Sequence, residues 1–542
     1  MEILFAILLG LFLGALDQTI VSVALPTIIT ELGGQELYTW TITIYLLTST
    51  ISVPFYGKLS DLYGRKPLLM IGITLFLVGS ALSGLSQNMT QLIIFRGIQG
   101  LGAGALFPIS LAVIGDLFSP AERGKYQGLF GAVFGLASIL GPLLGGFLTE
   151  QVSWHWIFYV NIPIGIAALV VIGRLLPTVR RPDASRNLDV LGGAVFTVAV
   201  GSLLIGLTNK AGGEWQDFEV GGLILIGLGL GVVFAFIESR AKEPIVPLGL
   251  WKIRTYATSI MATFLISFGF FGAAVFLPQW FQFVFGASPT DSGLYSLALL
   301  AGLIISSVGS GIIVSRTGRY KLPLLGGLGL MATGLFLMTN IRADTELPLL
   351  WLWMFITGLG IGPTLSVFTI VVQNAVPVRD LGVATSNLTF FRQIGGSVGL
   401  ALLGTVFANR LTEEIPTQLV AAGVPPQLVD QFAAQGGATG QDFFAVGEDL
   451  GQTILASVPE QLQALVAPLI DSIVLGIHQA FSIAIANVFM VGVFTTLGAL
   501  VVTLFMTELP LRQGYGPQHE AEHQVLPGAP AGARSGATPA VD

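Results

Sequence analysis

A single aspartate, Asp17, interrupts the first long apolar stretch of the sequence. A carboxylate inside a transmembrane helix costs about 2.5–3.5 kcal/mol on insertion scales, so such a residue is a functional hypothesis by default. On a helix, Asp17 shares one face with small residues that include Gly10 and Gly14, which predicts either tight helix packing or a cavity. Reversible protonation is the chemistry that we expect of Asp17. The alternative is a structural acid that caps a neighbouring helix or pairs with Arg96.

Two arginines, Arg96 and Arg392, also stand within apolar stretches. Arginine is not deprotonated in proteins, so Arg96 cannot itself carry a proton. It can bias a nearby carboxylate or donate to carbonyl groups across a gap between helices. A purely architectural role for Arg96 is the alternative.

Aromatic and amide side chains share one stripe of the stretch 257–283, and 381–407 carries a second polar patch. The amides indicate a cavity wall, because lipid would not solvate them. Packing in the core or against lipid is the alternative for the aromatic rings. Aromatic surfaces with a few polar groups suit apolar ligands of varied shape. We expect a substrate cavity to be lined by Gln18, Gln99, Phe268, Phe271, Gln279, Gln282, Asn387, Phe391 and Arg392.

The composition places these residues in a membrane. Of the 542 residues 53% are hydrophobic and only 10% are charged, whereas a soluble protein carries about 25% charged residues. Stretches long enough to cross a hydrocarbon core of about 30 Å recur along the chain. They predict an all-α integral membrane protein with fourteen transmembrane helices, near 3–28, 39–56, 68–86, 91–114, 126–149, 156–175, 189–209, 219–238, 257–283, 292–314, 323–340, 348–372, 381–407 and 481–506.

The basic residues predict how these helices are oriented. Nineteen of the 24 Lys and Arg residues fall in loops on one side of the predicted membrane, and three fall on the other side. Loops rich in Lys and Arg remain in the cytoplasm. The sequence therefore predicts a multi-pass protein of the cytoplasmic (inner) cell membrane with both termini in the cytoplasm.

A repeated segment divides the chain into two halves. The segment Gly57–Lys66 has a degenerate copy at Gly311–Arg319, at an offset of 254 residues. Two six-helix halves related by an axis along the membrane normal are a transporter arrangement, with the substrate site between them near the midplane. The predicted units are a first half at 1–176, a linker with two extra helices at 177–255, a second half at 256–511 with a long external loop at 410–476, and a disordered cytoplasmic tail at 512–542.

Five motifs together resemble the major facilitator superfamily and, within it, the fourteen-helix drug:proton antiporters. The resemblance covers nearly the whole chain, excluding the tail and most of the 410–476 loop. Each motif is short, but their combination is specific. The motifs are Leu16–Pro26, Gly57–Lys66, Phe95–Gly100, Gly135–Gly146 and Trp154–Pro163.

The resemblance implies roles for named residues. It assigns Asp17 and Arg96 to proton coupling. It implies a conformational latch formed by Gly57, Asp61, Gly64 and Arg65. In such a latch, a contact of Asp61 and Arg65 exists in one access state and breaks in the other. The alternative is that the charges of this loop only fix the topology. The antiporter motif comprises Gly135, Gly141, Pro142, Gly145 and Gly146.

The function that follows is a proton-coupled antiporter that exports amphipathic drugs or toxic compounds by alternating access. The alternative is an exporter of a lipid or cell-envelope metabolite, for which the 410–476 loop could dock a periplasmic or envelope partner. A channel, or a sensor that binds without transporting, fits poorly with two related halves and an antiporter motif. The identity of the exported substrate would distinguish these two hypotheses.

Several other classes of function are disfavoured by the sequence. The net charge of −7 leaves no basic surface for a nucleic acid, and there is no phosphate-binding G-x-x-x-x-G-K-[ST] segment. The pattern His519–His523 matches H-E-x-x-H, but it lies in a Gly- and Pro-rich tail without a helix to align the histidines, so we expect no metal site. We therefore expect no enzyme and no cofactor, with the proton gradient as the energy source. The expected partners are the bilayer, protons and a small amphipathic substrate, with the protein as a monomer.

Overall fold

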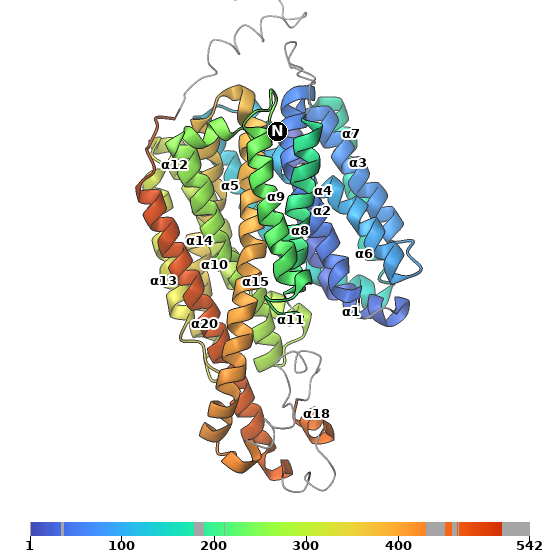
Figure 1. Ribbon diagram of the computed structural model, residues 1–542, viewed down its shortest axis with the longest axis vertical. Coiled ribbons are helices and arrows are strands. Elements are labelled where there is room, and N and C mark those ends of the chain that lie inside the picture. Colours follow the sequence, from blue (N-terminus) through green and yellow to red (C-terminus); the bar gives the residue numbers. More distant parts are fainter. Residues whose placement is uncertain are drawn as a thin grey trace, which may run out of the picture.

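The structure is a computed structural model, and it describes residues 2–33, 37–177, 189–210, 212–429, 450–457, 463 and 466–511. These residues form a bundle of long helices, and no strand occurs among them (Figure 1). The predicted all-α class is therefore confirmed. The predicted tail at 512–542 and the centre of the external loop lie outside the described residues.

The first half is built from six spans, of which the sixth is divided into two helices. Local sequence signals fix several of its helix ends. Gly64, with a φ of 96°, separates two helices at a position where most side chains would be strained. The Asn88 side chain caps one helix by accepting from the Gln91 N–H, and Ser119 and Glu122 form a capping box at the next. The helices are α1 (Glu2–Leu32), α2 (Tyr38–Tyr63), α3 (Arg65–Ser83), α4 (Met89–Leu117), α5 (Pro120–Gln151), α6 (Trp156–Tyr159) and α7 (Asn161–Leu175).

The linker contributes two helices that lie between the halves in Figure 1. They are α8 (Val190–Asn209) and α9 (Leu223–Glu238), with a short π-helix, η2 (Phe218–Gly222), before α9. The buried face of α8 packs in one apolar cluster with α2 and with the second half. Much of α9 exposes apolar side chains on the outer face of the bundle, as a helix facing lipid would. A 3-10 turn, η3 (Leu248–Lys252), leads into the second half.

The second half repeats the plan of the first with one enlarged connection. Its elements are α10 (Arg254–Val284), α11 (Pro289–Tyr295), α12 (Leu297–Thr317), α13 (Lys321–Met338), α14 (Leu347–Ala375), η4 (Val378–Asp380), α15 (Leu381–Ala421), α18 (Leu450–Ser457), η5 (Ala467–Leu469) and α20 (Ile470–Leu504).

Two of these helices, α15 and α20, extend past the ends of the predicted spans 381–407 and 481–506. Their extensions project from the bundle in Figure 1. The projecting parts pack with α18 in an apolar cluster that contains Leu419, Ile454, Ile473 and Ile477. This local packing stabilises helical structure outside the predicted spans.

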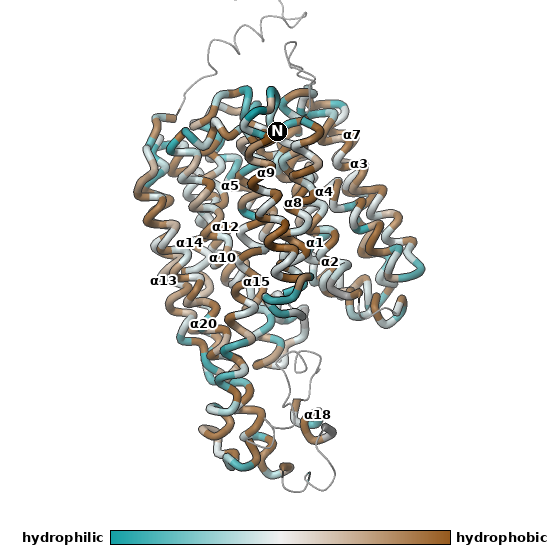
Figure 2. The backbone as a smooth tube through the Cα atoms, in the orientation of Figure 1, coloured by the Kyte–Doolittle hydropathy of each residue, from teal (hydrophilic) through white to brown (hydrophobic). Residues whose placement is uncertain are grey.

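Thirteen helical segments among the described residues are long and apolar enough to cross a membrane. The helix α2, which we expected as a further span, has 26 residues but is not one of the thirteen. Its many Thr and Ser residues lower its hydropathy, and it packs between α4 and α15. Figure 2 shows the hydrophobic residues along the lengths of the helices.

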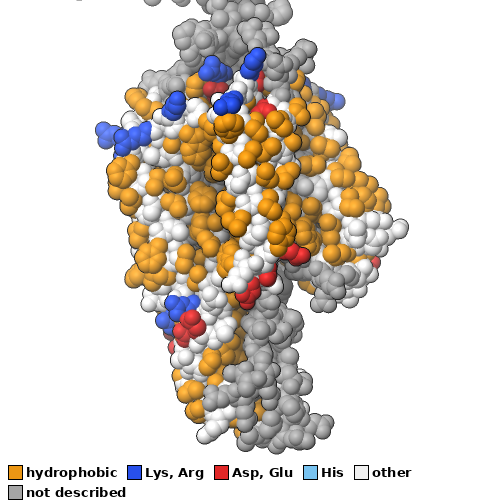
Figure 3. Space-filling model, viewed as in Figure 1, with side chains coloured by type: hydrophobic (Ala, Val, Ile, Leu, Met, Phe, Trp, Pro, Cys, Tyr) orange, Lys and Arg blue, Asp and Glu red, His pale blue; other side chains and the backbone are white. Residues whose placement is uncertain are grey.

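Basic side chains gather at one end of the bundle (Figure 3). This end, called the basic end below, contains the turns between α2 and α3, between α4 and α5, and between α12 and α13. Its charged residues include Lys58, Arg65, Arg123, Arg319 and Lys321. The extensions of α15 and α20 project from the opposite end.

The orientation of the bundle can be tested with single cysteines, because the chain contains none. Arg319 and Asp344 are exposed in turns at opposite ends of α13. We expect a membrane-impermeant maleimide to label Asp344→Cys in intact cells and to label Arg319→Cys only after lysis. Labelling of both variants in intact cells would contradict the predicted orientation of the basic end.

Candidate functional site

A buried ion pair lies at the centre of the first half. The Asp17 side chain on α1 is 0% exposed, and that of Arg96 on α4 is 2% exposed. Arg96 Nη1 donates to Asp17 Oδ2 at 2.6 Å, while Gln99 Nε2 and Asn161 Nδ2 donate to Asp17 Oδ1 at 2.7 Å and 3.0 Å. All three neighbours are donors, and an ionised carboxylate only accepts. The three bonds use both oxygens of Asp17 as acceptors.

Further polar and aromatic groups hold this pair in place. The Arg96 guanidinium lies 4.1 Å from the centre of the Tyr45 ring, a cation–π contact. Asn161 Nδ2 also donates to Ser80 Oγ at 3.1 Å, and Ser80 donates in turn to the carbonyl of Phe158 at 2.8 Å. The partners come from α2, α3, α6 and α7, so most helices of the first half meet at this cluster.

Three members of this cluster were not predicted as site residues. Asn161 had a signal in the sequence, since it is an amide at the start of an apolar span and lies within the Trp154–Pro163 motif. Tyr45 and Ser80 had none, because their residue types are ordinary in such helices. Gln99, predicted to line the substrate cavity, is 0% exposed and bonds both Asp17 and Arg96.

The predicted latch residues connect the two halves at the basic end. Asp61 pairs with Arg65 at 2.6 Å. The same carboxylate accepts from the backbone N–H groups of Gly382 at 3.1 Å and Val383 at 2.8 Å, in the first turn of α15. Free N–H groups and the positive end of the helix dipole make this a favourable place for a carboxylate. Arg65 also pairs with Asp116 of the first half at 2.8 Å.

Close packing accompanies these polar contacts. A Cβ at Gly57 would overlap the Ser386 hydroxyl, so only glycine allows α2 to approach α15 this closely. Nearby, Gln127 Nε2 of α5 donates to Gln373 Oε1 of α14 at 2.9 Å, and Gln373 Nε2 donates to the Leu111 carbonyl at 3.1 Å. The structure therefore represents a state in which the halves are closed together at the basic end.

One side of the antiporter motif packs α5 against α1. The Thr19 hydroxyl donates to the Ala137 carbonyl at 3.1 Å. A Cβ at Gly141 would overlap that hydroxyl, and one at Gly145 would lie 2.8 Å from the Ile20 carbonyl oxygen. Small residues thus allow α5 to contact the helix that carries Asp17, as in other close helix pairs in membranes.

Another side of the same motif faces the second half. A Cβ at Gly135 would press on a side chain of α12, and one at Gly146 would lie 3.3 Å from the Thr290 hydroxyl of α11. Pro142 faces Gly293 of α11. The helix α5 therefore contacts the acid-bearing helix and the opposite half together.

Part of the predicted cavity lining lies between α10 and α15. Phe268 and Phe271 pack against the α15 backbone at Gly399 and Gly396. Asn387 is buried and donates to the Tyr256 hydroxyl at 3.0 Å. These three side chains serve helix packing in this state.

The structure does not gather the remaining predicted residues into one pocket. Gln18 is exposed on α1, and Gln282 is exposed and donates to Ser292 Oγ at 3.0 Å. Gln279 is half-buried on α10. Phe391 lies with its ring centre 5.3 Å from that of Trp251, and the half-buried Arg392 lines a separate small cavity.

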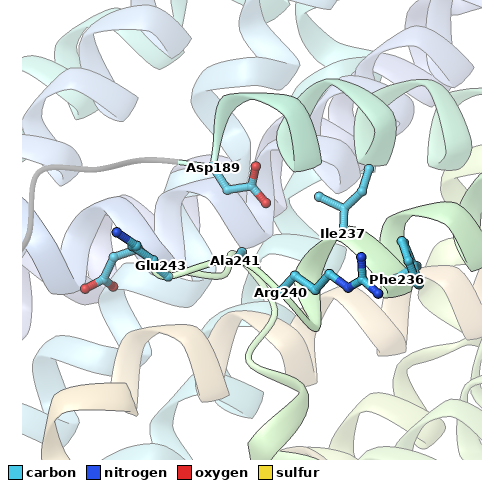
Figure 4. A pocket seen from close by; sticks show the side chains of 7 residues that line it. Asp189, Phe236, Ile237, Arg240, Ala241 and Glu243 are labelled. Carbon is cyan, nitrogen blue, oxygen red and sulfur yellow. The ribbon is translucent and has the colours of Figure 1, made fainter.

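A further cavity lies outside the predicted site. It has a volume of about 370 Å³, opens near the basic end, and contains no predicted site residue (Figure 4). Its walls come from the start of α8 and from the end of α9 with the turn that follows it. The lining residues are Asp189, Phe236, Ile237, Arg240, Ala241, Lys242 and Glu243.

Comparison with known proteins relates this geometry to a family. Residues 7–400 match the family model described as Major Facilitator Superfamily. The chain is 37% identical to the multidrug transporter protein MdtP of Bacillus subtilis over 93% of its length and 92% of that protein. It is 34% identical to multidrug resistance protein 3 of the same organism, with coverages of 93% and 94%. The solved proton:xylose symporter XylE has a similar fold, with a TM-score of 0.55 at 15% identity and coverages of 92% and 94%.

Proposed function

Because the chain belongs to the major facilitator superfamily, we propose that it is a proton-coupled antiporter that exports amphipathic drugs across the cytoplasmic membrane. Relatives named as multidrug transporters, similar over nearly the whole chain, support export of drugs. The observation that carries proton coupling is the fully buried Asp17, bonded by Arg96, Gln99 and Asn161.

The coupling follows from the bonds that Asp17 makes. A protonated carboxyl must donate its O–H, but Arg96 and the two amide nitrogens offer only donors to it. Uptake of a proton therefore requires at least one of these bonds to break, which loosens a connection between α1 and a neighbouring helix. Proton occupancy then biases the arrangement of α1, α4 and α7.

The contacts of α5 offer a route from this cluster to the opposite half. A shift of α1 acts on α5 through Gly141 and Gly145, and α5 in turn packs on α11 and α12 through other residues of the antiporter motif. Helices in such close contact move together because packed interfaces are not freely deformable. We propose that this packing transmits the change at Asp17 to the latch at Asp61.

The proposal is tested by measuring drug accumulation in cells that express the protein, with and without a proton gradient. We expect expression to lower the accumulation of several amphipathic dyes, and an uncoupler to abolish that difference. Lowered accumulation that persists without the gradient would contradict proton coupling. No export of any amphipathic drug, together with export of a labelled lipid, would favour the envelope-metabolite alternative.

A further inference from the structure

Arg392, in the middle of α15, has no counter-ion among the residues that the structure describes. It forms no hydrogen bond or ion pair with another described residue, and its Nη2 atom is buried without a partner. Arg96, the other arginine within a span, has Asp17 as its counter-ion. An unpaired charge within a membrane span is costly, which makes a role in binding a reasonable expectation.

Arg392 lines a small cavity between three helices of the second half. Thr263 and Ser267 on α10 and Thr364 on α14 also line this cavity. The Thr263 hydroxyl is buried and has no hydrogen-bond partner among the described residues, so two residues that line this cavity each carry a buried donor without a partner. Ile266, Phe270 and Leu365 supply the apolar part of the wall.

The cavity lies deep in the bundle. Arg392 is eleven residues from the start of α15, or about 16 Å along the helix at about 1.5 Å per residue. Phe270, at the cavity wall, has its ring centre 6.5 Å from that of Phe134 on α5, so the cavity borders the interface between the halves. Its volume of about 10 Å³ is at the lower limit for a single water molecule in this state. A larger ligand would enter only when the halves separate.

We propose that Arg392 binds an anionic group of the exported substrate, with the Thr263 hydroxyl as a second donor. A carboxylate or sulfonate accepts charge-assisted bonds from a guanidinium in a planar, two-pronged geometry. The apolar wall would receive the adjoining part of an amphipathic molecule. The preferred substrates are then amphipathic compounds that carry an anionic group, including zwitterions. This inference rests on the proposed export function and specifies its substrate class.

The test uses rhodamine B, which carries a free carboxylate, and its methyl ester, which is otherwise the same. Binding of each dye to the purified protein is measured by fluorescence titration in chloride-free buffer. We expect the wild type to prefer the acid, and Arg392→Gln to reduce the ratio of the two affinities by about 10- to 100-fold, since bonds to a charged partner are lost. Arg392→Lys should retain part of the preference because it keeps the positive charge.

Matched controls separate this inference from export itself. Arg316→Gln removes an exposed arginine at the basic end and should leave the affinity ratio at its wild-type value. Equal losses for both dyes in Arg392→Gln, or no preference for the acid in the wild type, would overturn the inference. If the inference fails in this way, export of the ester by the wild type would still support the proposed export function. A third outcome is that neither dye is preferred, while chloride raises the thermal stability of the wild type but not of Arg392→Gln. That outcome would assign the site to an inorganic anion and would also overturn the inference.

Discussion

Substrate-induced proton release is expected to disappear when Asp17 is replaced by Asn. The substitution keeps the size of the side chain and removes its titratable charge, so binding of substrate can no longer expel a proton there. Transport against a gradient should fall to the level of vesicles without the protein, and substrate binding should lose its dependence on pH. The measurement is the pH change on addition of substrate to purified protein in weakly buffered detergent.

The ion pair requires a control for folding. Asp17→Asn leaves Arg96 buried without its counter-ion, and breaking a buried pair in this way costs about 3–5 kcal/mol. The double variant Asp17→Asn with Arg96→Gln removes both charges and should recover stability without recovering proton release. Asp17→Glu keeps a titratable acid and should retain some release. Wild-type proton release in the stable double variant would show that the coupling acid lies elsewhere.

Replacing Asp61 with Asn is expected to open the basic end and to slow transport. Asparagine loses the charge that binds Arg65 and the α15 N-terminus, and bonds to a charged group contribute about 1.5–3 kcal/mol. The closed state should therefore become about 10- to 100-fold less favourable. Transport should fall by a similar factor, because a cycle needs both access states.

The closed state can be followed by the reactivity of one cysteine. Ser307 is buried on α12 and donates to the Gly128 carbonyl of the first half at 3.3 Å. We expect Ser307→Cys to react with maleimide about 10- to 100-fold faster when Asp61→Asn is also present. Asp116→Asn is the matched control, since it removes an Arg65 partner within the first half and leaves the Asp61 contact with α15 intact. If Ser307→Cys reacts equally fast with and without Asp61→Asn, and Asp61→Asn transports normally, the latch role is wrong and the charges of this loop only fix topology.

The sequence predicted the fold because a bilayer imposes strict requirements on length and polarity. A helix must bury about 20 apolar residues to cross it, so the spans were visible from hydropathy alone. The exceptions have physical reasons. The helix α2 packs inside the protein and can carry hydroxyl groups, while α15 and α20 continue past the predicted spans because they pack with α18 in an apolar cluster.

The sequence by itself determined which residues were unusual. A charge within an apolar stretch is costly enough to indicate a role, and this singled out Asp17, Arg96 and Arg392. Only the tertiary structure decided what each charge contacts, because partners such as Asn161 lie on helices far away in the chain. It paired Arg96 with Asp17 and placed the Asp61 carboxylate at the N-terminus of α15. It gave Arg392 no counter-ion among the described residues. Hydropathy depends on one residue at a time, whereas a charge inside a membrane is stabilised by its neighbours in space, and their identity is fixed only when the helices pack.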